Sequence, residues 1–100
     1  MNEKLVVEIS KCLSNPIRLT ILNWLKDPEN NFPSHNTVKH FNDGVCASYI
    51  HAKTNLSQST VSTYLSLMEK CGLLISTRHG KWSYFKRNEL LIEQYMLYFK

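Results

Sequence analysis

The chain has 100 residues, a net charge of +4 at pH 7 and 43% hydrophobic residues, which fits one globular domain spanning 1–100. It contains no apolar run that could span a membrane and no signal-peptide pattern at its N-terminus, so we expect a cytoplasmic protein without membrane partners. Three widely separated cysteines, Cys12, Cys46 and Cys71, form neither a disulfide framework nor a paired zinc motif. They fit reduced thiols.

The positive charge is concentrated in the second half of the chain. Residues 46–88 carry six basic side chains and one acidic side chain, whereas residues 1–45 carry five of each sign. An excess of this kind is typical of a nucleic-acid-binding surface. A solvated basic face would give the same count, so charge alone leaves both interpretations open.

The first half of the chain predicts three helices and one long loop. Apolar residues at helical spacing indicate a helix over about 3–13. Ser14-Asn15-Pro16 is a helix start signal, and the second helix is expected to end near Asp27-Pro28. Residues 28–44 are rich in Asn and Pro and predict a loop, after which a third helix runs from about Cys46 to Thr54.

The helix predicted over about 57–71 has an unusual outer face. Ser57 is placed to cap it, Leu56 to pack against its first turn, and Gly72 to end it. One side carries an apolar stripe of Val61, Leu65 and Met68. The other side carries compact hydroxyl and amide groups in place of charges, namely Gln58, Ser59, Ser62, Thr63 and Ser66. Short donors and acceptors suit a surface pressed against base edges and phosphates, so this stretch predicts a DNA-recognition helix.

A β-hairpin with a basic tip follows over about 73–86. Two strand-like runs are joined by Arg78-His79-Gly80-Lys81, where the glycine allows a tight turn. Helices followed by such a hairpin have the order of a winged helix-turn-helix, so we predict a mainly α fold with a small β-hairpin. The last helix, about 88–99, is apolar on most of its circumference and predicts a dimer interface with helix 3–13. Burial in the protein's own core is the alternative.

These features resemble the ArsR/SmtB family of bacterial winged-helix repressors over nearly the whole chain. The resemblance is carried by residues 13–22, 56–62 and 65–74 and by the wing over 78–85. It implies a homodimeric, cytoplasmic regulator that binds double-stranded DNA and usually represses its own operon. The implied major-groove contacts are Gln58, Ser59, Ser62 and Thr63, and the implied wing contacts are Arg78, His79 and Lys81. Many relatives have His or Arg at the position of Thr63, so the base preference can differ.

The metal sites of the family lack their ligands in this chain. Arsenic sensors carry two closely spaced cysteines at the start of the third helix, where this chain has Cys46 and then Ser48. Zinc sensors place Asp and His along the last helix, and residues 88–100 contain neither. His35, His40 and Asp43 are irregularly spaced and more typical of loop residues than of ligands. We therefore expect no metal site and no cofactor.

A thiol switch stays open as the alternative route of control. It would need an exposed thiolate of low pKa with a partner in range. Cys46 and Cys12 are the candidates, and Cys12 could approach Cys46 across the fold. Cys71, next to the terminating glycine, is more typical of packing.

The leading hypothesis is a homodimeric repressor that binds a roughly palindromic operator and is released by an unidentified small molecule or a redox event. The rival is a winged-helix protein–protein interaction module that does not bind DNA and uses its basic hairpin on an acidic partner. An enzyme is the least expected class, because the sequence shows no nucleophile–base arrangement, carboxylate pair, phosphate loop or metal triad.

Overall fold

The structure, a computed structural model, describes residues 1–34 and 41–100. The elements in chain order are α1 (Glu3–Leu13), α2 (Pro16–Lys26), α3 (Pro28–Asn31), β1 (Val45–Cys46), α4 (Ala47–Thr54), α5 (Gln58–Lys70), β2 (Leu74–His79), β3 (Trp82–Arg87) and α6 (Glu89–Tyr98). The strands form one antiparallel sheet in the order β1-β3-β2. Within the described ranges, no helix is long and apolar enough to cross a lipid bilayer. The predicted winged helix-turn-helix is confirmed.

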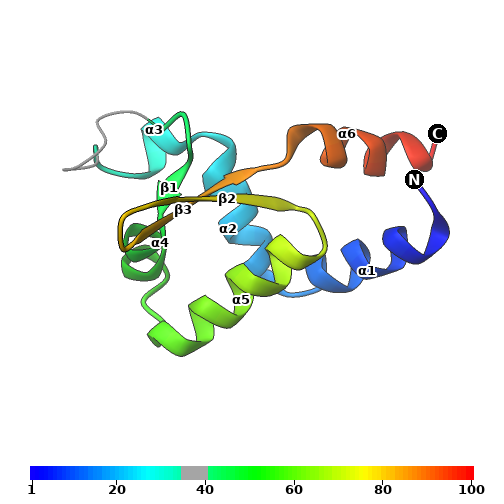
Figure 1. The fold of residues 1–100 in the computed structure, drawn as a ribbon. Coiled ribbons are helices and arrows are strands. Elements are labelled where there is room, and N and C mark those ends of the chain that lie inside the picture. Colours follow the sequence, from blue (N-terminus) through cyan, green and yellow to red (C-terminus); the bar gives the residue numbers. More distant parts are fainter. Residues whose placement is uncertain (35–40) are drawn as a thin grey trace.

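Two helices extend from the rest of the fold toward the same side. In Figure 1, α2, α4 and α5 gather against the sheet, while α1 and α6 extend from the same side of it and bring the two chain ends near each other. We call this pair the α1–α6 arm. The hairpin of β2 and β3, which we call the wing, extends from the opposite side, beyond the start of α5.

Polar caps set the starts of four helices, as their sequences require. The Asn15 side chain accepts hydrogen bonds from the amides of Ile17 and Arg18 at 2.9 and 3.0 Å, and Ser57 accepts one from Thr60 at 3.2 Å. Asn2 and Asn88 cap α1 and α6 in the same way. These side-chain oxygens satisfy amides that have no partner within the helix, which confirms the predicted starts of α2 and α5.

Two local predictions were wrong, and one short strand was not predicted. Residues 28–31 form the short helix α3 instead of loop, because a proline at the first helical position already has a helical φ. The third predicted helix is confirmed as α4, with Cys46 at its N-cap, but the strand β1 in which Cys46 pairs with Tyr84 of β3 was not predicted. The hairpin turn contains only Gly80-Lys81, since Gly80 adopts a φ of 61° and lets the strands continue through His79.

A single core holds the helix-turn-helix against the sheet. Its centre is made of fully buried side chains from five elements, including Ile9, Ile21, Ile50, Met68 and Val45. The predicted stripe of Val61, Leu65 and Met68 is at most 3% exposed, so the opposite side of α5 must face outward. Burial of this stripe fixes the rotation of α5 about its axis.

Gly72 lies where the end of α5 contacts α6. Its φ of 93° is the left-handed stop that the sequence predicts. A Cβ atom at this position would lie 2.6 Å from Cδ1 of Leu91. The arm therefore packs directly on the end of α5, and only glycine satisfies both the backbone and the contact.

Candidate nucleic-acid interface

The outer face of α5 is fully available to a ligand. Gln58, Ser59, Ser62, Thr63 and Ser66 are all exposed, whereas the stripe behind them is buried. The Thr63 hydroxyl donates to the Ser59 carbonyl at 2.9 Å, so it offers an acceptor and a methyl group outward. This face presents short polar groups and no charge, which is the surface required for close approach to base edges.

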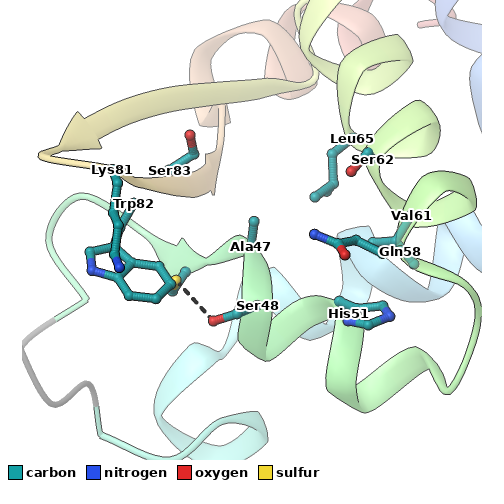
Figure 2. A pocket seen from close by; sticks show the side chains of 11 residues that line it. Ala47, Ser48, His51, Gln58, Val61, Ser62, Leu65, Lys81, Trp82 and Ser83 are labelled. Atoms are coloured by element: carbon teal, nitrogen blue, oxygen red, sulfur yellow. Dashed lines mark hydrogen bonds between the residues drawn. The ribbon is translucent and has the colours of Figure 1, made fainter.

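A hollow of about 320 Å³ lies between α4, α5 and the wing. In Figure 2, Gln58 and His51 lie on one side of it, and Lys81 and Trp82 lie on the other. Its walls come from β1, α4, α5 and the wing and comprise Cys46, Ala47, Ser48, His51, Gln58, Val61, Ser62, Leu65, Lys81, Trp82 and Ser83. We call it the α5–wing hollow. It offers amide, hydroxyl, imidazole, indole and ammonium donors to whatever enters it.

The three basic residues of the wing make different contacts. The Lys81 ammonium lies 5.1 Å from the centre of the Trp82 ring, a cation–π contact that holds it at the exposed tip. Arg78 donates from Nε to the Gly80 carbonyl at 3.2 Å and is also exposed. His79, in contrast, pairs through Nε2 with Oδ2 of Asp43 at 2.7 Å. A carboxylate therefore already occupies one ring nitrogen of His79.

The structure brings together only part of the predicted set. Gln58, Ser62 and Lys81 line the α5–wing hollow, whereas Ser59, Thr63, Arg78 and His79 do not. Sequence reasoning missed four further polar or aromatic residues in that hollow, namely Ser48, His51, Trp82 and Ser83. Ser48 and His51 are three residues apart on α4 and share a face, a spacing that could have indicated them.

Tyr64, whose place the sequence left open, supports α5 from behind. Its hydroxyl accepts a hydrogen bond from Nδ2 of Asn15 at 3.4 Å, and the Arg18 guanidinium lies 5.1 Å from its ring centre. Both partners belong to the start of α2. Tyr64 therefore anchors the recognition helix to the body and does not belong to its outer face.

The three cysteines are buried and free of disulfides, and they are grouped differently from the prediction. Cys12 does not approach Cys46, because α1 and β1 lie on different sides of the body (Figure 1). It lies instead beside Cys71 at the end of α5, with which it lines a common pocket. Burial, together with the neighbouring Cys71, raises the pKa of the Cys12 thiol to about 11. Cys46 lies 3.1 Å, Sγ to Oγ, from Ser48.

Metal ligands are not assembled in the part of the chain that the structure describes. Among residues 1–34 and 41–100, no three His, Cys, Asp or Glu side chains are placed to hold one ion. His35 and His40 lie outside the described residues, and Asp43 is engaged by His79.

Comparison with known proteins identifies the family. The sequence profile described as "Bacterial regulatory protein, arsR family" matches residues 45–76, which contain the helix-turn-helix and the start of the wing. The chain is also 43% identical over 83 residues, or 83% of each chain, to the uncharacterized HTH-type transcriptional regulator YbzH of Bacillus subtilis strain 168. This chain belongs to the ArsR family. It is a transcriptional regulator with a winged helix-turn-helix DNA-binding fold, and its family consists of regulators and not of enzymes.

Other ArsR-like proteins are similar at a greater distance. The putative arsenical resistance operon repressor ArsR2 of Halobacterium salinarum is 35% identical over 52 residues, which are 52% of this chain and 44% of that protein. A homodimeric winged helix-turn-helix DNA-binding domain, Mb0332 of Mycobacterium bovis, superimposes with a TM-score of 0.68 at 22% identity. The match covers 94% of this ArsR-family chain and 74% of the mycobacterial chain, and it supports the fold.

Proposed function

We propose that this ArsR-family regulator is a homodimeric repressor that binds an inverted-repeat operator in double-stranded DNA. The observation that carries the proposal is the arrangement around the α5–wing hollow. Gln58 and Ser62 face it from the recognition helix, and Lys81 faces it from the wing. Readers of bases and a neutraliser of phosphates thus lie on opposite sides of one concave surface.

In this proposal α5 enters the major groove. Gln58 reads adenine through two hydrogen bonds, and Ser59, Ser62 and Thr63 contact neighbouring bases or phosphates. The sugar–phosphate strand beside the groove occupies the α5–wing hollow, where His51 and Ser48 add donors. Lys81 and Arg78 neutralise phosphates or reach the minor groove. His79 contributes less, because it already pairs with Asp43.

The dimer is proposed to form through the α1–α6 arm. No residue of α6 is buried, and Leu90, Met96 and Phe99 are 67%, 63% and 64% exposed. Exposed apolar side chains on this scale are typical of a partner surface, and Val7 of α1 extends the same arm. A two-fold axis through the arm would present two α5 helices to two half-sites. The mycobacterial domain is a homodimer of the same fold, which supports dimerisation.

Leu97→Glu tests the dimer separately from DNA binding. A charge at this half-exposed position should convert the dimer to a monomer in sedimentation experiments. Ile75→Glu, at a similarly exposed position of β2, should leave the dimer intact and serves as the matched control. Equal behaviour of the two variants would contradict dimerisation through the arm.

Selection from a random duplex library tests operator recognition. The purified protein should enrich an inverted repeat with half-sites about one helical turn apart. Transcription in vitro from a promoter containing that repeat should then fall as protein is added. A selected site without two-fold symmetry would contradict binding as a homodimer. A rise in transcription would contradict repression.

A further inference from the structure

Two of the three cysteines form a pair between the dimer arm and the recognition helix. Cys12 lies in the last turn of α1, and Cys71 is the residue that directly follows α5. The two residues are 6% and 8% exposed and line one pocket of about 280 Å³. Figure 1 shows the end of α5 beside α1. The fold therefore brings together two thiols that are 59 positions apart in the sequence.

Both cysteines line this pocket together with Leu67 and four charged residues. Glu8, Lys11, Arg18 and Lys70 surround its mouth, so three cations face one carboxylate. Arg18 is fixed there by its Nε, which donates to the Cys12 carbonyl at 2.7 Å. Arg18 lowers the pKa of the Cys12 thiol, but burial and the neighbouring Cys71 outweigh it, so the pKa is raised to about 11.

We propose that Cys12 and Cys71 are a dithiol–disulfide switch that a hydroperoxide closes. The chemistry is independent of the DNA site, whereas its regulatory effect rests on the proposed function. Cys46 is excluded from the pair because it lies in β1, where its sulfur contacts Ser48. The disulfide would tie the arm to the end of the recognition helix.

Each sulfur has its own part in the reaction. Burial and the neighbouring Cys71 raise the pKa of the Cys12 thiol, so we assign the first attack to Cys71. Its thiolate takes the outer oxygen of the hydroperoxide, the O–O bond breaks, and water or alcohol leaves after protonation. Cys12 then attacks the Cys71 sulfenic acid, the S–S bond forms, and the displaced hydroxide leaves as water with the Cys12 proton. Two thiols are oxidised by two electrons, and a dithiol reductant reverses the change.

The bond would change the geometry that matters for DNA. Two thiols in contact must approach to about 2.05 Å between sulfur atoms, which moves the end of α1 relative to α5. In the proposed dimer this motion alters the separation of the two recognition helices. We expect oxidation to weaken operator binding by about 5- to 150-fold, the usual range of such coupling.

Digestion with trypsin places each cysteine on a separate peptide, so the disulfide can be identified directly. Cleavage after lysine and arginine yields peptides 12–18, 71–78 and 40–53, each with one cysteine. The full-length protein is treated with hydrogen peroxide, free thiols are alkylated, and the digest is analysed by mass spectrometry. We expect peptides 12–18 and 71–78 to be joined, and peptide 40–53 to be alkylated. A disulfide that involves Cys46, a bond between two chains, or three alkylated peptides would overturn the proposal.

Operator binding before and after oxidation then tests the regulatory part. Cys46→Ser should lose affinity on oxidation as the unmodified protein does, and Cys71→Ser should be insensitive to peroxide. Unchanged affinity of the oxidised protein would overturn the switch, even with the disulfide present. Failure of the reduced protein to bind any duplex would instead overturn the proposed function, while the peptide analysis would still decide the disulfide.

Discussion

The hydroxyl oxygen of Tyr95 in α6 lies 2.8 Å from Oγ of Ser10 in α1. Ser10 donates its own proton to the Val6 carbonyl at 2.8 Å, so the Tyr95 hydroxyl must be the donor in this pair. The bond joins the first and last helices of the chain. It fixes the spacing of the α1–α6 arm within one protomer, before any partner is bound.

Tyr95→Phe should reduce the stability of the arm. Removing one half-buried hydrogen bond should lower the free energy of unfolding by about 1 kcal/mol, since the Ser10 oxygen loses its donor. Urea denaturation at one fixed protein concentration measures the change. Tyr98→Phe, which alters a more exposed hydroxyl on the same helix, is the matched control and should have little effect. Equal losses of unfolding free energy in both variants would show that the Tyr95–Ser10 hydrogen bond does not stabilise the arm.

Gln58→Ala should relax the base preference of the protein. If Gln58 reads a base edge, its loss should reduce discrimination at one position of each half-site by about 1–3 kcal/mol. Competition between the selected operator and duplexes with single changes gives this number. Gln94→Ala changes the same residue type on exposed α6 and should leave the preference intact. An unaltered preference in Gln58→Ala would place base recognition elsewhere on α5.

Lys81→Ala should weaken binding to every duplex by a similar factor. The Lys81 ammonium is held at the tip of the wing by Trp82, where we propose that it contacts phosphate and not bases. The slope of log affinity against log salt concentration should become shallower by about 1. Lys26→Ala, which removes the same charge from the end of α2, should keep the original slope. A sequence-dependent loss in Lys81→Ala would contradict a phosphate role.

The Cys12 environment predicts a pH dependence of stability. Because the folded protein raises the pKa of Cys12 from 9.0 to about 11, the proton is held more tightly in the folded state than in the unfolded state. The resulting stabilisation is fully present below pH 9 and is lost as the pH rises toward 11. Thermal unfolding of the reduced protein across this interval should show a steeper decline than Cys12→Ser. Parallel profiles would contradict the shift. Lysine and tyrosine titrate in the same interval, so only the difference between the two proteins is informative.

Local chemistry explains which parts of the fold could be predicted. The caps Asn15 and Ser57 and the stop at Gly72 act within a few residues of themselves, so the bounds of α2 and α5 follow from the sequence. β1 has only two residues and exists because Val45 and Cys46 pair with β3 from far along the chain. A pairing of that kind leaves no periodic pattern.

The candidate interface could likewise be predicted only in part. The outer face of α5 could be predicted because burial of its apolar stripe determines which side chains face outward. The contributions of His51 and Trp82 could not, since they depend on how α4 and the wing converge on α5. The pairing of Cys12 with Cys71 likewise depends on the approach of α1 to the end of α5.

Salt-dependent binding to the selected operator tests the central claim most directly. Fluorescence anisotropy with the full-length protein should give tight binding at low salt and a linear fall of log affinity with log salt concentration. Each neutralised phosphate should contribute a slope of about −0.9. A duplex with scrambled half-sites should bind far more weakly at every salt concentration. Negligible affinity at low salt, or an affinity that does not change with salt, would contradict the account.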